Sequence, residues 1–100
     1  MPVQVTTNTT RADISVPFWN WKEADVAYIK TNYIDTGKMT APVVILSENQ
    51  HAKSVIRTFA SPAVLDEYQA ESIWLAATEE QRAYNRLNMQ TTTSTVAVVE

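Results

Sequence analysis

Residues 43–62 read VVILSENQHAKSVIRTFASP, and this stretch decides the fold of the chain. The apolar run Val43–Leu46 follows Pro42, and a polar stretch separates it from residues 54–60, where polar and apolar side chains alternate. Two such runs joined by a loop of about five residues predict an antiparallel hairpin, and the proline predicts that its first strand lies at a sheet edge. The dipeptide Ser61-Pro62 then begins a helix, because serine caps the first turn and proline has no N–H to leave unpaired there.

Downstream of this stretch, the pattern predicts helix and then a closing strand. A helix to about Ala77 is predicted by apolar residues that recur at helical spacing: Leu65, Tyr68 and Leu75. The sequence Thr78-Glu79-Glu80-Gln81 has the form of a capping box, which predicts a break and a shorter helix to about Asn88. Residues 91–100 are dominated by threonine and valine without a helical period, which favours a strand.

Upstream, a first helix is predicted over residues 21–36. Asn20 can cap its start, with Glu23 three residues later, and Gly37 can end it because glycine adopts a positive φ readily. Gly37 is the one glycine in the chain, so it is the clearest stop signal in the sequence.

A strand is predicted before this helix, over residues 14–18, where Ile14, Val16 and Phe18 alternate with polar residues or proline. Residues 2–7 alternate more weakly. They are consistent with an extra edge strand, with the start of the same strand across a bulge, or with a loose arm.

The predicted order of elements is strand, helix, strand, strand, helix, strand. This order is that of the ferredoxin-like fold, an α+β sandwich with a four-stranded antiparallel sheet and both helices on one face. We expect one such domain over residues 1–100. Because Val43 and Ile45 alternate with Val44 and Leu46, and Ile56 with its apolar neighbours, both sheet faces are expected to be apolar. The open face would then be covered by a second copy, giving a homodimer.

At this level the chain resembles the dimeric α+β barrel group, which includes antibiotic-biosynthesis-type monooxygenases and stress-responsive barrel proteins. The resemblance covers residues 14–99. It consists of the element order, the strand of residues 55–60 leading through Ser61-Pro62 into a helix with Glu67-Tyr68, and the closing threonine and valine strand. It implies the fold and a dimer. It carries no catalytic residue across, since no catalytic signature of the group matches.

Composition excludes several classes of function. The 100 residues have a net charge of −3 and no basic cluster, which argues against a nucleic-acid partner. There is no cysteine, no secretory signal and no apolar run long enough for a membrane span, so we expect a cytoplasmic protein with no membrane partner. His51 is the only histidine and has no second ligand at usable spacing, so we expect neither a metal site nor a cofactor.

Aromatic residues near the first helix cap and on the helices suggest a pocket for a small apolar, flat ligand. We expect Trp19, Tyr33 and Trp74 to bound a cavity between helices and sheet, with Arg57 as its polar anchor. The alternative is that these aromatic residues form the core or dimer contacts, and that Arg57 pairs with a carboxylate at the dimer seam. No catalytic residue is identified.

Three functions fit these expectations. The first is a small homodimeric ferredoxin-like protein without catalysis that binds an apolar ligand or none. The second is a cofactor-independent monooxygenase-like enzyme acting on a small aromatic molecule. The third is a non-catalytic interaction module of a larger assembly. The sequence does not decide whether the chain is an enzyme.

Overall fold

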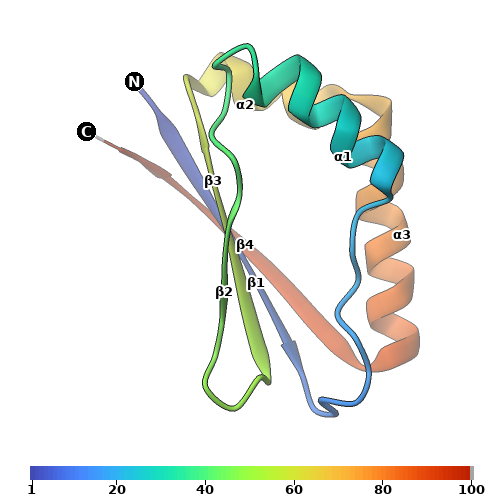
Figure 1. Cartoon of the computed structure of the whole chain (residues 1–100). Helices are drawn as coiled ribbons and strands as arrows, with labels where there is room; N and C mark the ends of the chain where they lie inside the picture. Colours follow the sequence, from blue (N-terminus) through green and yellow to red (C-terminus); the bar gives the residue numbers. More distant parts are fainter. Residues whose placement is uncertain (100) are drawn as a thin grey trace.

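A computed structural model describes residues 1–99 of the chain (Figure 1). Its elements are β1 Val3–Arg11, α1 Glu23–Ile29, the π-helix η1 Lys30–Ile34, β2 Val43–Leu46, β3 Ala52–Phe59, α2 Pro62–Ala70, α3 Ser72–Asn88 and β4 Gln90–Val98. The strands form one antiparallel sheet in the order β2-β3-β1-β4, and the helices cover one face of it (Figure 1). This is the predicted ferredoxin-like α+β fold, with β2 at an edge as Pro42 indicated.

The register places alternate residues of β1 on the face that the helices cover, here called the helix face. Val5 lies opposite Arg57 of β3 and Val96 of β4, and Thr7 lies opposite Val55 and Ser94. Since side chains alternate along a strand, the residues between these point to the other surface, here called the open face.

The core occupies one end of the helix face. Val3, Val5 and Phe59 of the sheet pack against the first two helices, with Tyr33 and Tyr68 between the layers. The Tyr68 ring lies 5.1 Å from the Phe59 ring and meets the Tyr33 ring edge-on at 5.3 Å. Aromatic pairs at these separations are favourable beyond their buried area, so this end of the sandwich is tightly packed.

The predicted first strand, residues 14–18, is wrong. These residues form a turn followed by an irregular segment. In the turn, the Asp13 carboxylate accepts hydrogen bonds from the backbone N–H of Ser15 at 2.9 Å and from its hydroxyl at 2.6 Å. Such a bond gives the backbone an alternative to a ladder. The weakly alternating segment at the N-terminus is instead β1, a central strand between β3 and β4, and not an edge strand or an arm.

The predicted helix break at residues 78–81 is also wrong. The Thr78 hydroxyl donates to the carbonyl of Trp74 at 2.8 Å, a bond made within a continuous helix, and α3 runs through this region. The chain breaks earlier, at Glu71, whose backbone is extended with φ −63° and ψ 136°. Three other local signals are confirmed: Ser61 caps α2, five residues join β2 to β3, and Gly37 has φ +79°. The predicted Asn20 cap is wrong, because α1 begins at Glu23 after Lys22 and has no side-chain cap. The predicted last strand is β4, and its predicted end, Glu100, lies outside the described residues.

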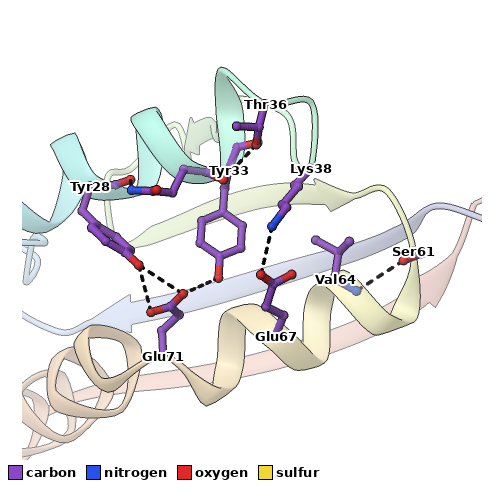
Figure 2. A network of polar contacts seen from close by, with 9 residues as sticks. Tyr28, Tyr33, Thr36, Lys38, Ser61, Val64, Glu67 and Glu71 are labelled. Carbon is purple, nitrogen blue, oxygen red and sulfur yellow. Dashed lines mark hydrogen bonds and ion pairs between the residues drawn. The ribbon is translucent and has the colours of Figure 1, made fainter.

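Glu71 joins the helices at this break (Figure 2). Its carboxylate accepts hydrogen bonds from the hydroxyls of Tyr33 at 2.7 Å and Tyr28 at 3.2 and 3.3 Å. A second link between the same segments is the ion pair of Lys38 with Glu67 at 2.9 Å. The first helical segment is thereby fixed to α2 and α3 at the packed end of the molecule.

The expectation that both sheet faces are apolar is wrong over most of the open face. On β1 this face carries Gln4, Thr6, Asn8 and Thr10, and on β4 it carries threonines at 91, 93 and 95. It is apolar mainly beside the edge strand, where Val43 and Ile45 of β2 adjoin Ile56 of β3. The prediction failed because β2 is apolar on both faces, whereas β1 and β4 carry polar residues on the open face.

Within residues 1–99, none of the helices is long and apolar enough to cross a membrane.

Candidate functional site

Beyond the packed core, a cavity of about 400 Å³ lies between the sheet and the helices. Its apolar wall is formed by residues from both layers and from the segment before α1: Val5, Phe59, Leu65, Trp74 and Trp21. Its polar wall is formed by residues of the sheet and of α3: Thr7, Thr92, Ser94, Thr78, Gln81 and Asn85. The volume and the mixture of apolar and polar walls are those of a small-molecule site.

A second cavity of about 250 Å³ adjoins the first, and the two share Thr7, Trp21, Arg57 and Gln81. Trp19, Val44, Val55 and Lys53 line only the second. The rings of Trp19 and Trp21 lie 5.9 Å apart. The two cavities therefore form one hollow along the helix face, divided around Trp21 and Arg57.

The polar wall is held by hydrogen bonds between α3, β4 and β1. Thr92 Oγ1 accepts from the side-chain amides of Asn85 at 2.8 Å and Gln81 at 3.5 Å, and lies 2.8 Å from the hydroxyl of Thr9. Because the Thr92 oxygen accepts from both amides, its own proton is free to donate to Thr9. The hydroxyls of Thr7 and Ser94 pair similarly at 3.2 Å.

Two buried polar atoms that belong to the lining have no hydrogen-bond partner among the described residues. They are the hydroxyl of Tyr68, a residue 4% exposed, and Oδ1 of Asn85, which is 9% exposed. Burial raises the pKa of the Tyr68 hydroxyl above its usual value, and the nearby positive charge of Arg57 partly opposes this rise. The lining residues thus include a neutral hydroxyl donor and an amide acceptor that no described protein group uses.

The structure separates the four residues expected at the site. Arg57 lines both cavities, Trp74 the first and Trp19 the second. Tyr33 lines neither; it is 1% exposed in the core and donates to Glu71, so its expected place in the pocket does not fit. Arg57 lies on the helix face, so it does not reach an interface on the open face.

The polar stripe of α3 was not predicted from the sequence. Thr78, Gln81 and Asn85 follow one another at intervals of three and four residues, and charged residues of the same helix lie outside this stripe. An uncharged polar stripe opposite a charged helix face is the signal that could have shown a polar inner wall.

His51 has a structural contact. Its Nδ1 lies 2.8 Å from the carbonyl of Arg11, and its backbone N–H donates to Asn49. Among the described residues, no group of three or more histidine, aspartate or glutamate side chains could hold a metal ion.

No protein-family model matches the chain, and none of the curated proteins matches it. Solved structures do share its fold. SnoaB, a cofactor-independent oxygenase from Streptomyces nogalater, has a TM-score of 0.67 at 11% identity, covering 99% of this chain and 93% of that one. Rv0793 from Mycobacterium tuberculosis has a TM-score of 0.63 at 14% identity, covering 100% and 96%.

A Caulobacter crescentus protein provisionally named an antibiotic biosynthesis monooxygenase has a TM-score of 0.62 at 13% identity, covering 98% of this chain and 91% of that one. These neighbours are antibiotic-biosynthesis-monooxygenase-like proteins of the dimeric α+β barrel group, so the resemblance is confirmed as a likeness of fold. Sequence identities this low show a shared fold, and they do not show a shared activity.

We expect Tyr68→Phe to leave the free energy of unfolding at pH 7 unchanged or slightly higher, because the lost hydroxyl is buried and has no partner within residues 1–99. Tyr33→Phe should cost about 1–3 kcal/mol, because its hydroxyl is bonded to a carboxylate. Urea unfolding followed by circular dichroism measures both. A loss above about 1 kcal/mol in Tyr68→Phe would show that its hydroxyl has a partner after all.

Tyr68→Phe should also change how the stability of the protein depends on pH. Since the pKa of Tyr68 is raised in the folded state, its contribution to stability is complete below the ordinary tyrosine pKa near 10 and is lost as pH rises above it. Stability of the unaltered chain should therefore fall above pH 10, and less steeply in Tyr68→Phe. Equal slopes would show that this tyrosine ionises normally in the folded protein.

Proposed function

We propose that this chain binds a flat aromatic molecule in the hollow between its helices and its sheet. The observation that carries the proposal is a cavity of about 400 Å³ with Trp21, Trp74 and Phe59 in its wall and the unpartnered hydroxyl of Tyr68 in its lining. Aromatic side chains bury large areas against a planar ligand, and a few placed polar groups fix its orientation.

The second candidate function is oxygenation of that molecule without a cofactor. It is supported by the fold shared with SnoaB, a cofactor-independent oxygenase, over nearly the whole chain. In such a reaction the substrate itself must supply electrons to O₂, and the protein must stabilise the anion formed when the substrate loses a proton. Arg57 and the Tyr68 hydroxyl are two donors of the lining that suit this purpose.

We also infer that the protein is a homodimer through the open face of the sheet. On the open face, β2 carries the apolar residues Val43 and Ile45, which are 55% and 53% exposed. An exposed apolar edge strand is a liability in a lone protomer. A twin sheet would cover Val43, Ile45 and Ile56, and the threonines of β1 and β4 would hydrogen-bond across the rest of the interface.

For the binding function, we expect 2-naphthol, a neutral two-ring probe, to bind with one site per chain and to quench tryptophan fluorescence. Trp74→Ala should weaken binding about tenfold, because one aromatic wall is lost. Leu87→Ala is the matched control, since Leu87 lies on the same helix and is 84% exposed. Titration calorimetry measures both affinities. If both variants fold and bind the probe with equal affinity, the cavity is not the binding site.

For the oxygenase function, the probe is anthrone, whose CH₂ group is acidic because the resulting carbanion is conjugated with the ketone and both rings. Loss of a proton, transfer of electrons to O₂ and loss of water give anthraquinone, with one O₂ consumed per anthrone. We expect oxygen uptake above the buffer background and at least a tenfold loss in Tyr68→Phe, with Leu87→Ala unchanged. If the rate of oxygen uptake equals the background while naphthol binds normally, the oxygenase function is wrong and the binding function stands.

For the dimer, sedimentation of the unaltered chain at micromolar concentration should give twice the protomer mass of 11.2 kDa. Ile45→Lys should give a monomer, because a lysine charge buried in the apolar part of the interface is costly. Ile14→Lys is the matched control, since Ile14 is 52% exposed, like Ile45 at 53%, and lies outside the sheet. A monomeric unaltered chain would overturn the dimer.

A further inference from the structure

The charged side chains of the hollow are all positive. Arg57 and Arg82 line the first cavity, and Lys53 and Arg57 line the second. None of the described residues that line either cavity is an aspartate or a glutamate, although the chain has 11 acidic and 8 basic residues. Positive charge is therefore concentrated in the hollow of an acidic protein.

Among the residues that the structure describes, neither arginine has a partner for its charge. Within residues 1–99, Arg57 and Arg82 make no ion pair and no side-chain hydrogen bond, whereas three surface lysines are paired with carboxylates. Arg57 is half-buried, so its guanidinium gives up part of its water without gaining an acceptor. A partly buried cation without an acceptor is unfavourable, and a bound anion would remove that cost.

Neighbouring charges reinforce the positive field. Lys53 lies on the same face of β3 as Arg57, four residues earlier, and its ammonium is 5.1 Å from the Phe18 ring. Its pKa is lowered, first by burial and then by the charges of Arg57 and Arg11. Like charges gathered in a partly buried hollow repel one another, and a negative ligand relieves this repulsion.

The Tyr68 hydroxyl is a second donor in the lining to which Arg57 belongs. It is buried, and among residues 1–99 it has no hydrogen-bond partner. A phenol and a guanidinium both donate hydrogen bonds, and an anionic oxygen accepts from both. Asn85 Oδ1, the other unpartnered atom of the lining, accepts and thus suits a ligand hydroxyl or N–H.

We propose that the ligand of this hollow is a planar aromatic anion, whose negatively charged oxygen is bound by Arg57 and the Tyr68 hydroxyl. The inference rests on the proposed binding function and gives its ligand class. The charged oxygen is that of a carboxylate or of an aromatic enolate or phenolate. Trp21 and Trp74 contact the rings, and Arg82 adds positive charge at the same cavity.

The test compares 2-naphthoate with 2-naphthamide, which have the same rings and nearly the same shape but differ in charge. We expect the carboxylate to bind the unaltered protein at least tenfold more tightly in calorimetry at pH 7. Arg57→Gln should abolish this preference and leave the affinity for the amide unchanged. Arg86→Gln, which removes an exposed arginine of α3 outside the lining, should keep the preference.

A second experiment tests whether the hollow binds the charged oxygen of a phenolate. Binding should lower the pKa of 4-nitrophenol itself, measured from the absorbance of its phenolate, and Arg57→Gln should abolish this shift. A carboxylate preference without a phenolate shift assigns the site to carboxylates. Equal affinity for naphthoate and naphthamide overturns the anion assignment and leaves aromatic binding intact, whereas failure of all probes to bind overturns both.

Discussion

The architecture depends on a change of side-chain chemistry halfway along β1. On the helix face, this strand carries Val3 and Val5 and then Thr7 and Thr9. The valines allow the helices to pack directly on the sheet, with Tyr33 and Tyr68 between the layers. The threonines must hydrogen-bond instead, and they do so with Ser94 and Thr92 of β4. Packing by dispersion and pairing of hydroxyls thus divide one sheet face into a dry end and a hollow end.

This division explains why the lining is a mixture of satisfied and unsatisfied groups. The side-chain oxygen of Thr92 forms hydrogen bonds with Asn85, Gln81 and Thr9, and these bonds fix α3 relative to the sheet. The Tyr68 hydroxyl lies at the boundary between the core and the hollow, where its ring is packed but its oxygen has no protein partner among residues 1–99. Native proteins rarely leave such atoms unpaired, and those that do so commonly use them for binding or catalysis. Oriented polar groups in a rigid wall are the feature that separates a binding cavity from a packing defect.

The sequence predicted the elements whose signals are local. The serine and proline that begin α2, the glycine after the first helix and the β2–β3 hairpin all depend on neighbours within a few residues, and each is present. β1 was misjudged because Thr7 and Thr9 break the apolar alternation, and they do so because they line the hollow. The break at Glu71 was missed because Tyr28 and Tyr33, which bind its carboxylate, lie about forty positions earlier. Arg57, Trp19 and Trp74 could be named as site candidates from residue type, whereas the unpaired state of Tyr68 and Asn85 follows only from three-dimensional packing.

The lining of the hollow extends along the chain from Val5 to Val96 and draws on four strands and three helices. No fragment of the chain contains it, and the unfolded chain has no counterpart of it. A molecule that occupies the hollow therefore binds the native state alone, and binding and folding are thermodynamically linked. At a free concentration one hundred times its dissociation constant, such a molecule stabilises the folded protein by about 2.7 kcal/mol. The melting temperature thus reports occupancy directly, and a thermal-shift survey of metabolites can search for the natural ligand without an assay for turnover.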